Sequence, residues 1–181
     1  MEGNTQKQKN PSLKDTLAFA AWVVARQNIS TTRSFERNYT KLSELEELIT
    51  SFTISCAEKL RKQKLCCNSL MVFINTNRRR TELLQYNQNI IVRLPYSTNS
   101  SLEITNFAVQ VLHRIFKEGY QYKKMGVIIM EFTDEGKSQI NMFENSDKQH
   151  KLLMESVDKI NARYGQHKIK LASQDLKNCG K

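Results

Sequence analysis

The apolar residues of this chain follow two spacings, which predict two kinds of element. Four short stretches rich in β-branched residues are typical of strands and cover residues 28–35, 69–75, 89–94 and 125–132. Two longer stretches, which begin at Ser43 and Ser100, repeat apolar residues every three or four positions, as an amphipathic helix does. The predicted order is therefore strand, helix, strand, strand, helix, strand.

The ends of these elements carry local signals. Ser43 with Glu46, and Ser100 with Glu103, match the capping-box pattern that begins a helix. The first helix should run for about six turns, at 3.6 residues per turn. Gly119 is expected to end the second helix, and Pro95 the third strand. The polar residues from Thr133 to Ser138 are expected to hold no strand.

This order predicts an α+β fold of the split β-α-β kind. Two helices with one apolar face each can cover only one side of a four-stranded sheet. The other side must face water or a partner. The fold occurs in many nucleic-acid binders and in unrelated proteins, so it does not decide the function.

Three stretches lie outside this core. Met1 to Asn10 is polar and predicts a disordered arm, and Leu13 to Ala25 predicts a short apolar helix without an evident packing partner. After a further polar stretch, Leu153, Val157, Ile160 and Tyr164 recur on one face of a third predicted helix, which Gly165 should end. We expect a tail helix there, followed by a basic tail.

The charge narrows the class of partner. The chain has 28 Lys and Arg against 18 Asp and Glu, a formal net charge of +10. Such an excess favours a polyanion, because Lys and Arg beside phosphates release counterions. No apolar run is long enough to cross a bilayer, so no membrane partner is expected. The expected compartment is the cytoplasm.

The sequence predicts neither a metal nor a cofactor. The four cysteines lack the C-x-x-C spacing and the nearby histidine pair of a zinc site, and free thiols are expected. His113, His150 and His167 have no nucleophile partner in the sequence, so each is expected to be solvated or hydrogen-bonded rather than catalytic. Asp134 and Glu135 are expected to be turn residues rather than a metal pair.

Several short motifs, kept in order from about Gln27 to at least Gly165, resemble one known family. They are Thr32-Arg33-Ser34-Phe35, Ala57-Glu58-Lys59-Leu60-Arg61, Val72-Phe73-Ile74, Val92-Arg93-Leu94-Pro95-Tyr96, Gly119 to Val127 and Gln139 to Phe143. The chain is similar here to the C-terminal part of UmuC-like proteins, the catalytic subunits of SOS-induced, Y-family translesion DNA polymerases.

The resemblance implies three parts. Residues 1–26 would lie outside the family. Residues 27–134 would form a little-finger domain, which grips primer-template DNA through its sheet. Residues 135–181 would be a C-terminal extension in which Gln139, Ile140, Asn141, Met142 and Phe143 bind the sliding clamp. The resemblance also implies a UmuD-like protein as a further binding partner.

The chain departs from the family at two points. Glu36 follows Arg33-Ser34-Phe35, where the family has a glycine. The metal-binding acidic clusters of the polymerase palm also have no counterpart between Met1 and Arg26, so we expect no polymerase activity from this chain and no catalytic residues.

The expected DNA contacts are basic or polar residues on the strands and in the loops beside them. They are Arg33, Ser34, Asn75, Arg78, Arg79, Arg93, Lys123 and Lys124. Lys59 to Lys64 is interpreted instead as a charge cluster that stabilises the C-terminal end of a helix.

Two other functions stay open. An RNA-binding module can have the same topology, although only Phe73 is available to stack a base. A clamp-binding decoy that hardly touches DNA is the second alternative.

Overall fold

The computed structural model describes residues 28–137, 148–165 and 168–169. Its elements follow the predicted order. They are β1 (Ile29–Tyr39), α2 (Leu42–Lys62), β2 (Leu65–Thr76), β3 (Asn87–Thr98), α3 (Ser101–Ile115), β4 (Tyr122–Asp134), the short 3-10 helix η1 (Glu135–Lys137) and α4 (Lys148–Tyr164). The predicted helix at 13–25, the polar arm before it and the peptide at 139–143 lie outside the described residues.

The four strands form one sheet in the order β1-β4-β2-β3, and every neighbouring pair is antiparallel. β1 and β2, which α2 joins, therefore run parallel with β4 between them. β3 and β4, which α3 joins, run parallel with β2 between them. The predicted split β-α-β fold is confirmed.

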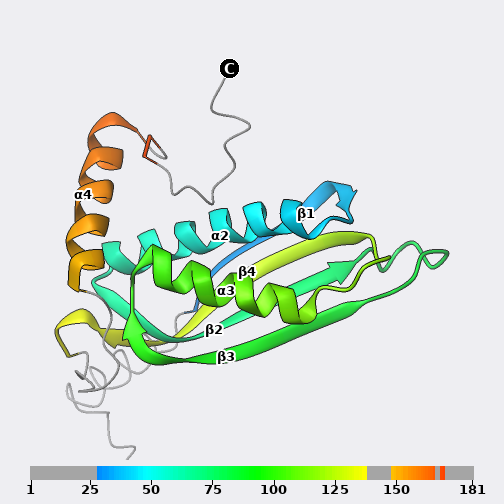
Figure 1. The fold of residues 1–181 in the computed structure, drawn as a ribbon, viewed down its shortest axis with the longest axis horizontal. Helices are drawn as coiled ribbons and strands as arrows, with labels where there is room; N and C mark the ends of the chain where they lie inside the picture. Colours follow the sequence, from blue (N-terminus) through cyan, green and yellow to red (C-terminus); the bar gives the residue numbers. More distant parts are fainter. Residues whose placement is uncertain (1–27, 138–147, 166–167, 170–181) are drawn as a thin grey trace, which may run out of the picture.

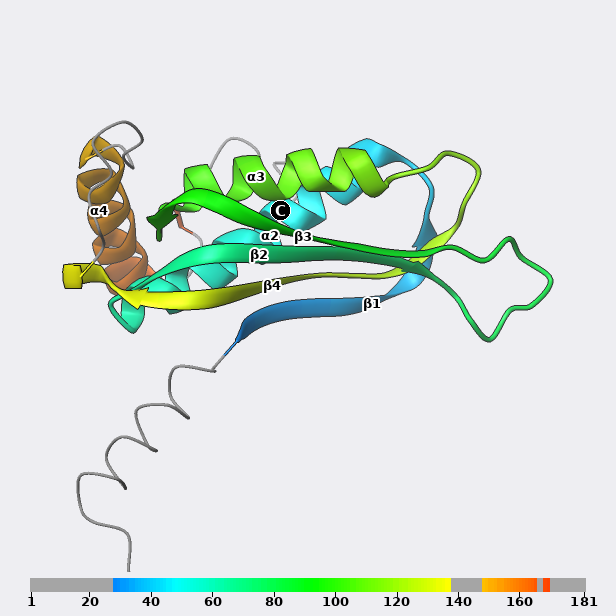
Figure 2. The same cartoon turned by 90° about the horizontal axis from the view of Figure 1, so that it is seen from below.

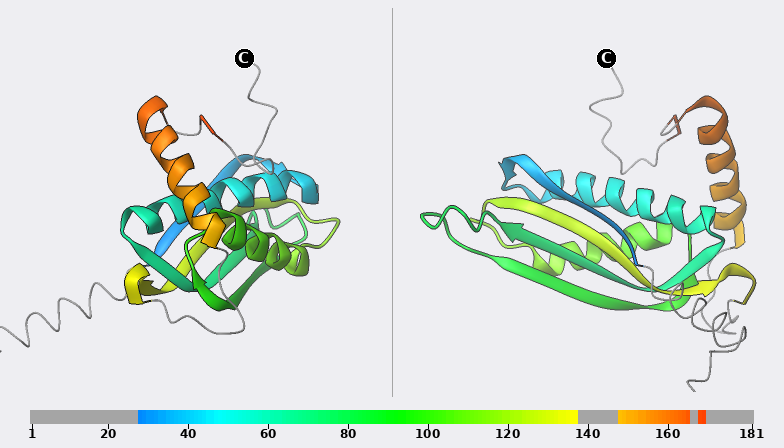
Figure 3. Two further views of the ribbon diagram at one scale, coloured as in Figure 1. Left: turned by 60° about the vertical axis from the view of Figure 1, so that its left-hand side comes forward. Right: turned by 180° about the vertical axis from the view of Figure 1, so that it is seen from behind.

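Helices α2 and α3 both lie on the same face of the sheet (Figures 1 and 2). Alternate residues of the central strands, such as Val72 and Ile74 of β2 and Val127 and Ile129 of β4, are fully buried beneath them. No described element covers the other face, which we call the open face (Figures 2 and 3). The core thus lies between the sheet and the two helices, as predicted.

All four strands are longer than predicted. The sequence did not indicate the full strand lengths because the strand ends carry polar residues. A strand with one solvated face can include such residues. Pro95 does not end β3, which was a wrong prediction. β3 is an edge strand, and Pro95 lies where its register with β2 shifts between Arg93 and Thr98, so the missing N–H interrupts no regular ladder. β4 likewise continues through Thr133 and Asp134, which were expected to hold no strand.

Neither predicted capping box forms. Helix α2 begins with Lys41 as its N-cap, so Ser43 lies inside the helix, and Glu46 instead contacts Nε2 of His113 on α3. Ser100 is the N-cap of α3, but its side chain makes no capping bond. Tertiary partners of the two glutamates replace the local bonds there.

At the start of α3, the hydroxyl of Thr98, the last residue of β3, donates to Glu103 and accepts from the backbone N–H of Ser100. Thr98 therefore provides hydrogen bonds at the start of the helix in place of the predicted capping box. The helix ends at Ile115, before Gly119, which lies in the following loop with a φ of +85°.

Helix α4 confirms the predicted tail helix, and it stands against the ends of α2 and α3 (Figure 3). Met154 is its buried anchor, at 2% exposure. Arg61 of α2 binds both carboxylate oxygens of Asp158, at 2.6 and 2.8 Å, and also donates to the backbone oxygen of Asn99 and the hydroxyl of Ser101. Arg61 lies in the last turn of α2 with Lys59 and Lys62, as predicted, and it also binds α4.

Candidate nucleic-acid interface

The open face is polar at one end. Because directly opposed residues of paired strands point to the same face, its composition can be read from the register. Ser34, Lys124, Asn75 and Asn87 form one polar row across β1, β4, β2 and β3. This row lies at the end of the sheet from which the β2–β3 hairpin projects (Figure 2).

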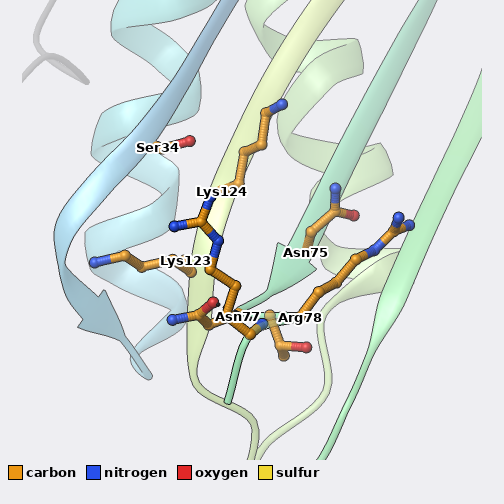
Figure 4. A pocket seen from close by; sticks show the side chains of 8 residues that line it. Ser34, Asn75, Asn77, Arg78, Lys123 and Lys124 are labelled. Atoms are coloured by element: carbon orange, nitrogen blue, oxygen red, sulfur yellow. Dashed lines mark hydrogen bonds between the residues drawn. The ribbon is translucent and has the colours of Figure 1, made fainter. Parts of the chain in front are cut away.

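A hollow of about 330 Å³ opens at this end. Eight residues from the ends of β1, β2 and β4 and from the β2–β3 loop line it: Ser34, Asn75, Thr76, Asn77, Arg78, Arg79, Lys123 and Lys124. Four of the eight are cationic and none carries a carboxylate. We call this site the cationic hollow (Figure 4).

An irregularity of the sheet places two consecutive lysines of β4 at the hollow. The register between β2 and β4 shifts between Asn75 and Thr76, which leaves Lys123 as an extra residue on β4. The ammonium group of Lys123 then donates to the backbone oxygen of Glu36 at 2.6 Å. Lys124 lies in the polar row, with its ammonium group 5.9 Å from the ring centre of Phe73. Both lysines therefore line the hollow from adjacent positions.

The loop that carries the arginines is held by one glutamine. The side-chain amide of Gln85 donates to the backbone oxygens of Asn77, Arg80 and Leu83, at 3.2, 2.8 and 3.1 Å. The side-chain oxygen of Asn77 accepts from the backbone N–H of Arg79 at 3.1 Å. The loop backbone is thereby fixed while the guanidinium groups of Arg78 and Arg79 stay available.

The predicted residues divide into three groups by position. The hollow brings together Ser34, Asn75, Arg78, Arg79, Lys123 and Lys124. Arg93 is exposed on the open face opposite Ser69, six residues along β2 from Asn75 or about 20 Å at 3.3 Å per residue. Arg33 is exposed on β1 in the row of Met125 and Ile74, whose buried side chains face the helices, so it points away from the hollow.

Asn77, Thr76 and Gln85 were missed by sequence reasoning. The dense Asn and Gln content between the two strands is the signal that could have found them. Glu36, the departure from the family glycine, does not adopt a positive φ, since only Lys64 and Glu131 do so among the described non-glycine residues. Its backbone oxygen supports Lys123, so the substitution is compatible with the site.

The histidines of the described ranges are hydrogen-bonded, as expected. His113 contacts Glu46, and Nδ1 of His150 lies 3.2 Å from the carboxylate of Glu103. Within those ranges no group of three or more His, Cys, Asp or Glu residues could hold a metal ion. None of the helices described there is long and apolar enough to cross a bilayer.

Burial raises the pKa of the cysteine thiols. Desolvation is the main cause for Cys56 and Cys67, and it raises the pKa of Cys66 to about 11 from 9.0. All three are free thiols, as predicted. Their side chains remain protonated at neutral pH and therefore act as core residues rather than nucleophiles.

Comparison with known protein families gives two matches along the chain. Residues 26–142 match the impB/mucB/samB family C-terminal domain, and residues 151–179 match a domain of unknown function, DUF4113.

Two curated relatives cover most of this chain. Protein UmuC of Salmonella typhimurium is 30% identical over 84% of this chain and 36% of its own length. Protein MucB of Escherichia coli is 31% identical over 85% of this chain and 36% of its own length. The chain thus spans about a third of the length of the curated relatives it matches.

Two solved structures align with part of this chain. An insertion ternary complex of Dbh DNA polymerase aligns over 59% of this chain and 28% of its own, with a TM-score of 0.48 and 7% identity. A complex of the β-clamp processivity factor and the little finger domain of PolIV aligns over 65% of this chain and all of the matched chain, with a TM-score of 0.42 and 12% identity.

Proposed function

Because the chain belongs to the impB/mucB/samB family, we propose that it is the DNA-gripping C-terminal part of a translesion DNA polymerase of the SOS type. In this proposal residues 27–134 hold primer-template DNA and residues 135–181 connect the polymerase to its partners. Phosphoryl transfer would belong to the part of the relatives' length that this chain does not span. The chain alone would therefore bind DNA without extending it.

The observation that carries the proposal is the cationic hollow. Arg78, Arg79, Lys123 and Lys124 face one space without a lining carboxylate, so their charges are not neutralised there. Guanidinium and ammonium groups bind phosphate oxygens, and Ser34 and Asn75 add neutral hydrogen-bonding groups from the sheet. Such contacts position a nucleic-acid backbone and carry no direct sequence information.

The open face extends the site beyond the hollow. Lys124 and Phe73 lie together on it, and Arg93 lies further along. A duplex backbone that enters at the hollow could follow the sheet toward Arg93. We therefore expect DNA contact from both positions, with the larger share from the hollow.

The first experiment compares substrates by fluorescence anisotropy. The complete chain is titrated into labelled primer-template DNA, single-stranded DNA and single-stranded RNA of matched length. Tightest binding to primer-template DNA is expected. A clear preference for single-stranded RNA would refute the proposal in favour of an RNA-binding module, for which the partly exposed ring of Phe73 would be the stacking platform.

The second experiment tests docking on the sliding clamp through Gln139 to Phe143. Phe143→Ala should weaken clamp binding by more than about 2 kcal/mol, because a buried aromatic anchor carries much of a small interface. The control is Tyr164→Ala, which removes an aromatic ring that is 60% exposed on α4. Equal binding by the unmodified chain and Phe143→Ala, measured by surface plasmon resonance, would refute this part of the proposal.

A UmuD-like protein is the third partner that we propose, on the basis of family membership alone. Co-elution with the complete chain in size-exclusion chromatography would test it. A clamp decoy would bind the clamp normally and show no measurable affinity for primer-template DNA, so the anisotropy titration separates that alternative from ours.

A further inference from the structure

Away from the cationic hollow, the open face carries a group of apolar side chains, and Arg93 lies beside them in the row of Met130. Ile128, Met71 and Ile91 lie side by side in one row across β4, β2 and β3, and Met130 follows Ile128 on the same face of β4. We call these four residues the apolar patch. Ile91 is 61% exposed, and the other three are partly exposed. Large apolar side chains grouped on a surface mark a docking site more often than single ones do.

None of the described helices covers this patch. Helices α2 and α3 lie on the opposite face, and α4 is held at their ends through Arg61 and Glu103 (Figures 2 and 3). The patch therefore needs a partner from outside the described residues.

The chain itself supplies a segment with matching chemistry next to the patch. Residues 17–24 read Leu-Ala-Phe-Ala-Ala-Trp-Val-Val, which is the most apolar run of the sequence and has no packing partner among the predicted elements. It precedes β1 directly. Residues 25–28 can span up to about 14 Å at 3.3–3.6 Å per residue. Ser30 of β1 pairs with Ile128, a member of the patch, about 5 Å away across the strands.

We propose that residues 17–24 pack on the apolar patch. The sheet then has three layers, with α2 and α3 on one face and this segment on the apolar patch of the other. The segment leaves the cationic hollow uncovered. This arrangement rests on the patch and its distance from β1, so it stands whether or not the hollow binds DNA.

Methionine oxidation measures whether the patch is covered. The complete chain is treated with dilute hydrogen peroxide and compared with a full-length variant that carries Leu17→Ser, Phe19→Ser, Trp22→Ser and Val24→Ser. Oxidation of Met71 and Met130 should become several-fold faster in the variant. Met125 and Met154, at 0% and 2% exposure, are internal controls that should stay slow.

Unchanged oxidation of Met71 and Met130 would overturn the proposal. A rise at Met154 instead would mean that the segment covers α4, which would also overturn it. If protection of Met71 and Met130 depends on protein concentration and not on the four substitutions, a second copy of the chain covers the patch and the proposal is wrong.

The reciprocal test changes the patch and observes the segment. Ile91→Lys should speed amide hydrogen exchange across residues 17–24 several-fold, because a charged side chain at the patch opposes apolar packing. The matched control is Leu152→Lys, which places the same charge at a position of α4 with 68% exposure. Equal exchange in the unmodified chain and both variants would overturn the proposal.

Discussion

Loss of two cations from the cationic hollow should change the salt dependence of DNA binding by a calculable amount. Each neutralised phosphate contributes about −0.9 to the slope of log K against log salt for duplex DNA. The four cations of the hollow then give a slope of about −3.6, so affinity should fall about 150-fold between about 50 and 200 mM salt. Arg78→Gln with Lys124→Gln should reduce the slope to about −1.8 and the loss of affinity to about 12-fold.

The structure supplies a control of equal charge. Arg114→Gln with Lys62→Gln removes two exposed cations from α3 and α2, the helices on the other face of the sheet. This pair should leave the slope close to that of the unmodified chain. Anisotropy titrations at four or more salt concentrations measure both variants. Equal reductions of slope by the two pairs would show that the net charge, rather than the hollow, determines binding, and our reasoning would be refuted.

Three further predictions concern the body of the protein. Gly126→Ala should lower stability by about 1–3 kcal/mol, because a Cβ there would lie 2.7 Å from the ring of Phe73; chemical denaturation measures the loss. Asp158→Asn should speed amide exchange in α4, since Arg61 loses the ionic part of its contact with the helix. Stability should also fall as the pH rises from 9.0 to about 11, because the folded chain keeps the proton of Cys66 after the unfolded chain has lost it; urea midpoints across this range, with and without Cys66→Ala, test the sign.

Each of these predictions has a control or a contrary result. Gly136→Ala, at a position with no atoms within 4 Å of an added Cβ, should change stability little. Glu44→Gln breaks the exposed Arg37–Glu44 pair and should leave exchange in α4 unchanged, since exposed pairs contribute only about 0–1 kcal/mol. A urea midpoint whose pH dependence above 9.0 is identical with Cys66→Ala would show that the thiol contributes nothing.

The order of the elements could be predicted because each has its own apolar pattern. The apolar residues of α3, such as Ile104, Ala108 and Leu112, recur at helical spacing in the sequence. All three are buried, as expected. The strand ends were not predictable in this way. Leu65 and Asp134 extend β2 and β4 beyond the predicted strands because they pair with each other, and nothing in their own neighbourhoods signals it.

The sequence could predict which residues belong to the candidate site, but not that they lie close together. Arg78, Arg79, Lys123 and Lys124 stand out by charge, yet about 45 positions separate the two pairs. They meet because β4 inserts between β1 and β2, a property of the whole topology. Arg33 shows the opposite case. It neighbours Ser34 in sequence, and the alternation of strand side chains sends the two residues to different faces.

The bonds of Arg61 have a consequence for the way α4 can leave the body. If Asp158 departs with the helix, the guanidinium loses its carboxylate partner but still donates to the backbone oxygen of Asn99 and the hydroxyl of Ser101. Besides this pair, the described contacts of α4 with the body include an ion pair of Lys151 with Glu135, the contact of His150 with Glu103 and the buried side chain of Met154. These contacts are mostly polar, so we expect the last helix to be held less firmly as ionic strength rises while the apolar core keeps the sheet intact.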